Sequence, residues 1–315
     1  MKRHNCSLTI MNPYRQSTIK RNLQLRARII QTVRKFFIHH GYLEIETPHR
    51  IPAPAPEAHI DAEVSGDWFL HTSPELCMKR LLAAGFSKIF QICKCFRKAE
   101  RGSQHLPELT MLECYSAGHN YFDMMDQCEQ LVQFILRKLG FGESISYQGA
   151  QIDLKIPWIR MSVTEAFDKL ASISMHDALA ADRFDEVMVE EIESHLGLNP
   201  IFLYDYPASR GALARLKSDD TSLAERFELY IGRLELCNSF SELTDPDEQR
   251  ERFEKERSFR KSSGRRVYPL PQKFLYALRD MPDAAGNALG IDRLVMLFAD
   301  TTKIDDVVAF TPEEL

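Results

Sequence analysis

The sequence lacks the features that mark several large classes of protein. It has no glycine-rich phosphate-binding signature of the Rossmann or P-loop type, which argues against those two nucleotide-binding folds. It also has no apolar run of the length that a signal peptide or a membrane-spanning helix needs. We therefore expect a cytoplasmic protein with no membrane partner.

The sequence also has no excess of positive charge. The 315-residue chain carries 40 lysines and arginines against 45 acidic residues, which gives a formal net charge of −5. Proteins that bind nucleic acid without sequence preference rely on positive charge placed near the phosphates. The charge balance therefore argues against a general polyanion binder.

Cysteines are few and do not follow a metal-binding spacing. The seven cysteines are scattered, odd in number and never spaced C-x-x-C. This usage favours a reduced, cytosolic set over a disulfide framework. Cys93 and Cys95 alternate along one expected strand, and we interpret them as residues that fill a strand face rather than as metal ligands.

The pattern of apolar residues indicates a mixture of helices and strands. Helical spacing, caps and terminal glycines predict helices within the segments 18–40, 73–85, 121–139, 163–170, 182–196, 244–264 and 286–300. Alternation predicts strands at 43–47, 88–97, 108–115 and twice within 226–240. There is no regular βαβ alternation, so we expect an α+β fold in which an antiparallel sheet is flanked by helices.

The stretch IFQICKCFRKAERGSQHLPELTMLECY, residues 89–115, holds the first candidate site. Read as two strands joined by a loop, it places Arg97 at the end of one strand and Glu113 and Tyr115 on one face of the other. If the two faces are on the same side of the sheet, a cation, a carboxylate and a phenol share one floor. A purely structural Arg–Glu pair is the alternative. The connection is too long and polar for a tight turn, and we expect a flap.

A second candidate depends on a turn at Gly232 and Arg233. A two-residue turn would make Tyr230 face Glu235 and would put Glu228, Tyr230 and Glu235 on a common face. Two neighbouring carboxylates repel unless a cation lies between them, and oxygen ligands suit Mg²⁺ held jointly with a substrate phosphate. The alternative is an ordinary solvent-facing strand.

Arg293 lies in the closing apolar helix, shortly after Gly290. A buried arginine needs a partner, and a glycine at the approach lets a flat ligand come close to the backbone. Glu242 precedes a helix, where a surface acid would be unremarkable. Two arginines and paired acids on an antiparallel sheet describe a site for a magnesium-bound triphosphate.

These segments resemble a known family, in the right order along the chain. FRKAERGSQHLPELTMLECY resembles motif 2 of the class II aminoacyl-tRNA synthetases, GNALGIDR resembles motif 3, and the helix with GYLEIETP resembles the dimer-forming motif 1. TSPELCMKRLL and FELYIGRLELCNSFSELTDPDEQRERF resemble the substrate and metal segments of the lysyl branch. The resemblance is greatest to the short lysyl-synthetase paralogues that attach lysine or β-lysine to elongation factor P. It implies the class II synthetase catalytic fold over residues from about 20 to 312.

The resemblance implies roles for individual residues. Arg97 would bind the α-phosphate of ATP and Arg293 the γ-phosphate side, as the catalytic residues. Further residues implied at the nucleotide are Lys98, Ala99, Glu100, His105, Leu106, Leu109, Glu235, Leu236 and Gly290. A Mg²⁺ ion would be held by Glu228 and Glu235. Residues implied at the amino acid are Ser73, Pro74, Glu75, Glu113, Tyr115, Asn238, Glu242 and Ala288.

The implied amino-acid pocket suits a diamino acid. Such a substrate needs negative groups at both ends, and Glu75, Glu113 and Glu242 supply them. Lysine and (R)-β-lysine both present two amines and a carboxylate, so the sequence leaves the choice between them open.

The sequence departs from the family around the nucleotide. The family usually has Glu where this chain has Ala99, Asn where it has Leu106, Phe where it has Leu109, and Gly where it has Ser239. We expect these positions to alter the contacts around adenine, and Glu100 to supply the carboxylate that Ala99 lacks.

We expect one catalytic domain over residues 1–315, with a tail at 1–17 and a dimerisation helix and strand at 18–48. Lysyl-type synthetases carry an anticodon-binding β-barrel before motif 1, which needs on the order of 100 residues. About 40 residues precede Gly41, so we expect no such domain and no tRNA substrate. Ala288 points the same way, because lysyl-tRNA synthetases have glycine there and the factor P ligases have alanine.

The function implied is an ATP-dependent ligase. It would activate lysine or (R)-β-lysine as an aminoacyl-adenylate and pass the aminoacyl group to a lysine of elongation factor P. Aminoacylation of tRNA or a tRNA-like RNA and a non-catalytic regulatory role are the alternatives.

Overall fold

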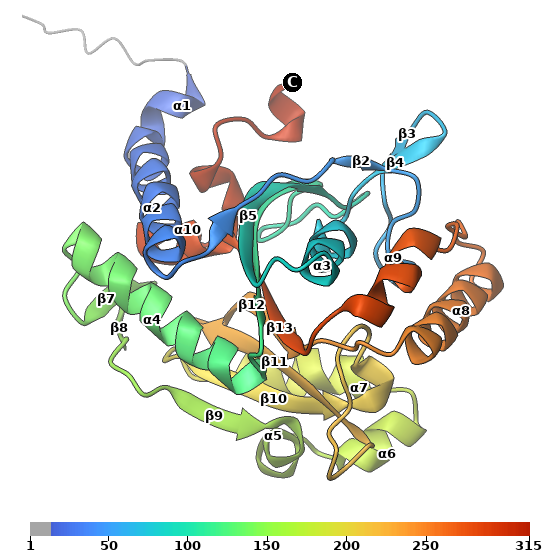
Figure 1. Ribbon diagram of the computed structural model, residues 1–315. Helices are drawn as coiled ribbons and strands as arrows, with labels where there is room; N and C mark the ends of the chain where they lie inside the picture. The colour runs from blue at the N-terminus through green and yellow to red at the C-terminus, as the bar shows by residue number, and fades with distance from the viewer. Residues whose placement is uncertain (1–13) are drawn as a thin grey trace, which may run out of the picture.

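The computed structural model describes residues 14–315 and is built around an eight-stranded sheet (Figure 1). The strand order is β1-β5-β6-β13-β12-β11-β10-β9. Neighbours run antiparallel except β1 with β5 and β9 with β10, which are parallel. The predicted α+β fold with a mainly antiparallel sheet is therefore confirmed.

The strands of the large sheet come from the whole length of the chain. They are β1 (Leu43–Glu44), β5 (Lys88–Phe96), β6 (Glu108–Ala117), β9 (Ile159–Ser162), β10 (Ile201–Pro207), β11 (Leu223–Ile231), β12 (Leu234–Ser241) and β13 (Ala284–Gly290). Two small sheets contain β2 (Arg50–Ile51), β3 (Val64–Ser65) and β4 (Trp68–Leu70), and β7 (Ser144–Tyr147) with β8 (Ala150–Asp153).

Helices cover both faces of the sheet. The α-helices are α1 (Arg15–Thr18), α2 (Lys20–His39), α3 (Glu75–Ala83), α4 (Tyr121–Leu139), α5 (Val163–Leu170), α6 (Met175–Ala180), α7 (Phe184–Val187), α8 (Pro246–Ser262), α9 (Gln272–Ala277) and α10 (Ile291–Ala299). In Figure 1, α2, α4 and α10 lie on one side of the central strands, and α3, α8 and α9 lie on the other.

The main hydrophobic core fills the side covered by α2, α4 and α10. Apolar residues at helical spacing, such as Val33, Phe36 and Phe37, are buried there against strand residues such as Phe90 and Leu112. Fully burying each such side chain stabilises the fold by about 1.5–3 kcal/mol. A smaller core lies beneath α3, α8 and α9, and this second face of the sheet carries the candidate site.

Several local signals in the sequence are confirmed. Gly140 ends α4 in the left-handed conformation, as the terminal glycine predicted, and the structure adds a capping box of Asn120 with Asp123 at the start of that helix. Asp245 caps α8, with Pro246 at the first helical position, as expected. No helix within residues 14–315 is long and apolar enough to cross a membrane.

Other expectations need correction at element boundaries. The predicted N-terminal tail is shorter than 1–17, because Arg15–Thr18 forms α1; residues 1–13 of that tail lie outside the described residues. The strand expected at 43–47 is only Leu43–Glu44. The helix expected at 182–196 is irregular, with α7 followed by a π-helical turn at Met188–Ile192. The first half of the motif-3 segment is a central strand, β13.

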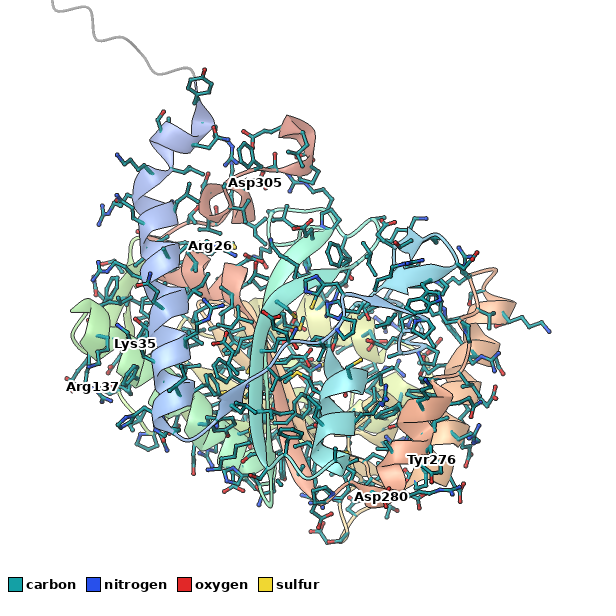
Figure 2. The ribbon with its side chains drawn as sticks, turned by 45° about the horizontal axis from the view of Figure 1, so that its top comes forward. Arg26, Lys35, Arg137, Tyr276, Asp280 and Asp305 are labelled. Atoms are coloured by element: carbon teal, nitrogen blue, oxygen red, sulfur yellow. The ribbon has the colours of Figure 1, made fainter. Side chains whose placement is uncertain are left out.

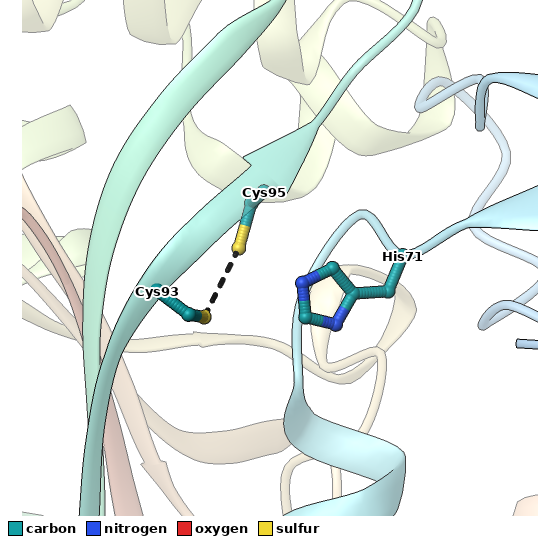
Figure 3. A group of neighbouring side chains, drawn as sticks. All are labelled: His71, Cys93 and Cys95. Carbon is teal, nitrogen blue, oxygen red and sulfur yellow. Dashed lines mark hydrogen bonds between the residues drawn. The ribbon is translucent and has the colours of Figure 1, made fainter. Parts of the chain in front are cut away.

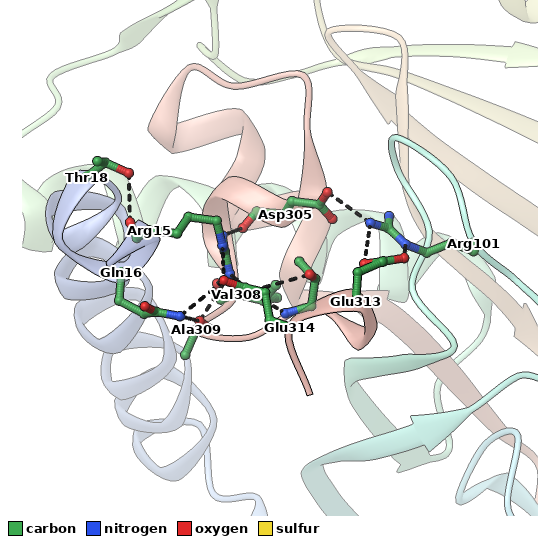
Figure 4. Close-up of polar contacts among 10 residues, drawn as sticks. Arg15, Gln16, Thr18, Arg101, Asp305, Val308, Ala309, Glu313 and Glu314 are labelled. Carbon is green, nitrogen blue, oxygen red and sulfur yellow. Dashed lines mark hydrogen bonds and ion pairs between the residues drawn. The ribbon is translucent and has the colours of Figure 1, made fainter. Parts of the chain in front are cut away.

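The flap between β5 and β6 packs against the C-terminal segment. Arg101 binds Glu313 at 2.9 Å and Asp305 at 3.0 Å, while Arg15 binds Glu314 at 2.6 Å (Figure 4). The backbone N–H of Ile304 also donates to Ser103 O at 2.8 Å. Such partly exposed ion pairs stabilise by only about 0–1 kcal/mol each, so the backbone contact matters as much as the charges.

Candidate active site

The strand register brings the first candidate cluster together. Glu113 of β6 lies opposite Gln91 of β5 and opposite Ala288 of β13, and Tyr115 lies opposite Gly286. Residues directly opposite on paired strands point to the same side of a sheet. The two strand faces therefore lie on the same side of the sheet, which is the condition that the sequence left open.

The hairpin between β11 and β12 turns where the sequence predicted. Gly232 and Arg233 both have φ of 62°, the left-handed conformation that a two-residue hairpin turn requires. Tyr230 lies opposite Glu235, as expected. Glu228 and Glu235 therefore share one face of the sheet with Tyr230, which confirms the predicted placement of the second cluster.

A β-bulge that the sequence did not reveal completes this face. After Tyr230 and Glu235 the register shifts by one residue, so that Glu228 lies opposite Asn238. In a regular strand Glu235 and Asn238 would point to opposite faces, because they are three residues apart. The bulge puts both on the site face and leaves Leu236 buried in the main core. A nucleotide contact by the Leu236 side chain, which the resemblance implied, has no support here.

The amino-acid end of the floor is a buried cluster of charges. Lys79 of α3 lies 2.6 Å from Glu75 and also forms an ion pair with Glu242 at the end of β12. The Lys79 and Glu242 side chains are 0% exposed. Burial raises the pKa of Glu242 to about 8, although the Lys79 ammonium acts against this shift. Burial opposes the charge on Lys79, but the two carboxyl groups together raise its pKa.

Glu113 forms the third acid of this pocket. Ser73 Oγ donates to Glu113 Oε1 at 2.5 Å, and Tyr115 OH donates to Oε2 at 3.0 Å. Burial, with the nearby Glu75 carboxylate, raises the pKa of Glu113 well above its usual value. Ser73 also accepts from the N–H of Glu75 at 3.0 Å, so one hydroxyl joins the start of α3 to the acid on β6.

Gly286 is required by the packing of this pocket. A Cβ at this position would lie 2.3 Å from Tyr115 Cε1 and 2.4 Å from Glu242 Oε1. Real Cβ atoms do not approach so closely, so the phenol and the carboxylate occupy the space that any larger residue would need. Ser239, where the family commonly has glycine, donates its hydroxyl to Gly286 O at 2.6 Å.

The nucleotide end of the floor carries two arginines. Arg97 follows β5, with Nη1 at 3.7 Å from Glu100 Oε2, and its buried Nε has no hydrogen-bond partner among the described residues. Arg293 of α10 donates to Glu235 Oε2 at 3.0 Å and contacts His105 Nε2 of the flap at 2.7 Å. Burial, and then the Arg293 charge, lowers the pKa of His105.

Hydrogen bonds join the segments that resemble motifs 1, 2 and 3, and they fix the position of the helix that carries Arg293. Arg26 of α2, labelled in Figure 2, donates to Asp292 at 2.6 Å and to Thr110 Oγ1 of β6 at 2.7 Å. Asp292 also accepts from the backbone N–H of Thr110 at 2.7 Å. The buried carboxylate next to Arg293 thus ties its helix to the neighbouring strand and to the first long helix.

The acid pair at the nucleotide end, Glu228 and Glu235, is surrounded by more polar side chains than the sequence indicated. Glu228 accepts from Arg226 at 2.5 Å and from Tyr206 and Tyr230 at 2.7 Å each. Glu193 Oε1 lies 3.1 Å from the same Tyr230 hydroxyl. Burial raises the pKa of Glu228, whereas the arginines around Glu235, led by Arg293, outweigh its burial and lower its pKa. The sequence missed Glu193, because it lies in an irregular helix with no motif around it.

Some of the remaining residues predicted for the site do not line it in the structure. Leu106 is buried in the main core, so its side chain does not line the nucleotide end. Lys98 is exposed, and Ala99 adopts a left-handed conformation with φ of 61°. Leu109 packs with Ala288 beside the two cysteines of β5. Pro74 lies immediately before α3, where Ser73 was expected to be the cap.

A groove with a volume of about 940 Å³ lies elsewhere. It is lined by residues of α3, α8, α9 and the turn after α9, including Tyr276 and Asp280 (Figure 2). Its α3 residues include Cys77 and Arg80, whereas Glu75 and Lys79 of the same helix belong to the charge cluster. None of the predicted site residues lines this groove.

Comparisons with known proteins agree with this arrangement. The family model for tRNA synthetases class II (D, K and N) matches residues 5–314. The chain is 38% identical over 312 residues to the elongation factor P--(R)-beta-lysine ligase of Vibrio atlanticus, covering 93% of this chain and 96% of that protein. The proteins of the same name from Salmonella dublin and Edwardsiella ictaluri are 38% and 36% identical over 308 residues, 92% of this chain and 94% of each relative. The chain belongs to the class II tRNA synthetase family of the D, K and N type, whose chemistry implies the use of ATP.

Proposed function

We propose that this protein activates (R)-β-lysine or lysine with ATP and transfers the aminoacyl group to a lysine side chain of elongation factor P. The names of relatives that are 36–38% identical over nearly the whole chain support this function. The amino-acid pocket is the structural observation that carries it.

The charges of that pocket suit a substrate with two amines. Lys79 pairs with Glu75 and Glu242, Glu113 lies near Glu75, and within residues 14–315 Lys79 is the one cation with which these three acids form an ion pair. When all three acids are ionised, an excess of two negative charges remains, which two ammonium groups of a diamino acid would balance. A buried charge left without a partner costs several kcal/mol, so a substrate with one amine would bind poorly.

Activation would take place between the pocket and the arginines. The amino-acid carboxylate attacks the α-phosphorus of ATP in line, a new P–O bond forms, and the bond to pyrophosphate breaks. Arg97, whose Nε has no partner within residues 14–315, would stabilise charge on the α-phosphate, and Arg293 would hold the departing pyrophosphate.

Transfer would need no covalent bond to the protein. The neutral amine of the acceptor lysine attacks the acyl carbon of the adenylate, AMP leaves with the electron pair of the broken C–O bond, and the new amide loses a proton. The long stem of a lysine lets it reach an adenylate in a cleft.

Glu228 and Glu235 are the residues that would hold Mg²⁺. Their site offers oxygen ligands on one face of the sheet, which is the chemistry that Mg²⁺ prefers. The ion would supply charge neutralisation of the phosphate oxygens. Arg226 and Arg293, which pair with these acids in the structure, would then share them.

We also propose a homodimer through residues 18–48. Ile38 of α2 and Leu43 of β1 are large apolar residues that are 59% and 51% exposed, in the segment that resembles motif 1. Changing Leu43 to Glu should weaken the dimer, and sedimentation would measure this. A stable and active monomer of the unmodified protein would contradict the proposal.

The acceptor is tested directly. The protein is incubated with ATP, one of the two lysine isomers, and either elongation factor P or lysine tRNA, and both acceptors are then weighed by mass spectrometry. We expect a gain of one aminoacyl residue on the factor, faster with (R)-β-lysine, and none on the tRNA. A gain on the tRNA alone would overturn the proposal, and so would the absence of amino-acid-dependent pyrophosphate exchange. An elongation factor acts in the cytoplasm, and the proposed function places the enzyme there.

A further inference from the structure

A cluster of sulfur and imidazole side chains lies beside the catalytic floor and takes no part in the proposed reaction. Cys93 and Cys95 alternate on β5, and their Sγ atoms are 4.0 Å apart. His71, in the connection from β4 to α3, faces them (Figure 3). A ring nitrogen of His71 and both sulfur atoms lie within 4.8 Å of one another, and all three side chains are buried.

We propose that His71, Cys93 and Cys95 bind one soft or borderline metal ion of the Zn²⁺ type. Thiolate and imidazole ligands select such ions, whereas Mg²⁺ takes oxygen ligands. Within residues 14–315, no other set of three histidine, cysteine or acidic side chains lies this close together. The site is therefore chemically distinct from the acid pair at which nucleotide-bound Mg²⁺ is proposed.

The distances fit such an ion with small side-chain movements. In a tetrahedral site the Zn–S bond is about 2.3 Å, which places two sulfur ligands about 3.8 Å apart. The two sulfurs are already at 4.0 Å. His71 Nε2 lies 2.7 Å from Lys94 O, and Lys94 stands between the two cysteines on β5. This contact holds the imidazole beside the sulfurs.

Both thiols must lose their protons to bind the ion, because cysteine coordinates a metal as the thiolate and a bound dication displaces the proton. The displaced protons pass to solvent, so binding changes no oxidation state.

The ion would join two segments that carry the proposed active site. His71 lies two residues before Ser73, which contacts Glu113, and Cys95 lies two residues before Arg97. The fourth position of the ion would be taken by water or by His49, whose ring centroid is 5.1 Å from that of His71. A bound ion would thereby fix the start of α3 relative to the end of β5, the two places where amino acid and α-phosphate are expected to meet.

Metal analysis of the full-length protein tests the site. Purified without chelator, the protein should retain about one equivalent of zinc per chain after dialysis, and Co²⁺ added to the chelated protein should give thiolate-to-cobalt charge-transfer absorption. We expect Cys95→Ala and His71→Gln each to weaken Zn²⁺ binding at least about 100-fold. Removing a residue that only hydrogen-bonds to a metal ligand weakens binding by up to about 100-fold, and removing a ligand itself should cost at least as much.

A matched control is present in the same chain. Cys128 and Cys237 have their Sγ atoms 3.8 Å apart in the main core, but among the described residues no third ligand completes that pair. Cys128→Ala should therefore leave the zinc content at its original value. X-ray absorption of the zinc-loaded, unmodified protein should show two sulfur neighbours, and this measurement holds even if a variant fails to fold.

Three results would overturn the proposal. One is a protein that binds no Zn²⁺ or Co²⁺. Another is a zinc environment of oxygen and nitrogen only. The third is a Cys93–Cys95 disulfide in the protein as isolated, which would indicate a redox role. Pyrophosphate exchange is measured in parallel, so a failure of the proposed ligase function is seen separately from a failure of this site.

Discussion

The two ends of the catalytic floor manage their charges in opposite ways. At the amino-acid end, Lys79 and Glu242 are 0% exposed and a single ammonium is shared between acids. At the nucleotide end, Arg97 and Arg293 are 26% and 18% exposed, and each lies near a carboxylate of its own. The amino-acid end is therefore shielded from water and has fewer positive than negative groups. At the nucleotide end the charged side chains are partly exposed to water, and each arginine has its own carboxylate partner.

This difference suggests separate roles for the two ends: one selects the amino acid, and the other promotes formation of the adenylate. A charge that loses its partner in a dry site costs several kcal/mol, so the amino-acid end can discriminate strongly between substrates with one and two amines. Partly exposed arginines can exchange a carboxylate for a phosphate at lower cost, because water screens the intermediate states. We therefore expect changes at the first end to alter the KM for the amino acid, and changes at the second to alter the rate of adenylate formation.

The largest effect is expected at the nucleotide end. Arg97→Ala should lower the rate of adenylate formation about 10²- to 10³-fold, the usual loss when one preorganised charge-stabilising donor is removed. Pyrophosphate exchange measures it. Arg101→Ala is the control, because Arg101 lies on the same flap but binds Asp305 and Glu313 of the C-terminal segment. Exchange that is unchanged in a folded Arg97→Ala protein would remove Arg97 from the site.

A similar change at the amino-acid end should act on binding. Glu242→Gln leaves Lys79 with Glu75 alone and removes one charge from the pocket. We expect the KM for lysine or (R)-β-lysine to rise about 100-fold and the KM for ATP to change less than about threefold. Glu129→Gln is the control for a buried acid outside the site, since Glu129 accepts from the Trp158 N–H. Equal effects on both substrates would argue against a selective role for Glu242.

Two glycines of β13 sharpen the comparison. Gly286→Ala would force a Cβ against Tyr115 and Glu242, and overpacking of this kind costs about 1–3 kcal/mol. The KM for the amino acid should therefore rise about 10-fold or more. At Gly290 a Cβ would meet its nearest atom at 3.8 Å, so Gly290→Ala disturbs nothing within the chain and should raise only the KM for ATP. Identical kinetic changes in both variants would mean that the two ends do not act separately.

The sequence predicted the strand-borne parts of the site better than the parts that depend on folding at a distance. Period-2 geometry and a two-residue turn placed Glu113 and Glu235 on the correct face, because these rules act over a few residues. The bulge that puts Asn238 on the same face leaves no comparable trace, since it depends on how β12 pairs with β11.

Lys79 and His71 show two further limits. The spacing of Glu75 and Lys79 on α3 is a helical i,i+4 pair, which could have been found, but the burial of that pair against Glu242 could not. His71 is separated from Cys93 by 21 residues of sequence, so no local pattern places it beside the two cysteines, which do pack with Met111 on the strand face as interpreted. Leu106 was expected at the nucleotide and lies in the core instead, since a resemblance aligns positions but not side-chain directions.

The smallest expected effect is the pH dependence that belongs to the amino-acid end alone. The pKa of Glu242 is raised from 4.5 to about 8 by burial, while the pKa of Lys79 is raised and keeps that ammonium charged throughout this range. Binding a substrate ammonium requires the ionised carboxylate. The ionised fraction of a group with this pKa rises about fivefold between pH 7 and pH 8, so kcat/KM for the amino acid should rise by a similar factor.

Stability should change in the opposite direction at the same group. A raised pKa in the folded state means that folding favours the protonated carboxyl, so the contribution of Glu242 to stability is complete below about pH 4.5 and is lost as the pH rises through about 8. Both pH trends should disappear in Glu242→Gln. The variant should show neither the rise in kcat/KM between pH 7 and 8 nor the fall in melting temperature with rising pH that the unmodified protein shows. Pyrophosphate exchange and thermal melts over this range measure them. A Gln variant that keeps the full pH dependence of kcat/KM would assign it to another group, and Glu113, whose pKa burial also raises, would be the next acid to change.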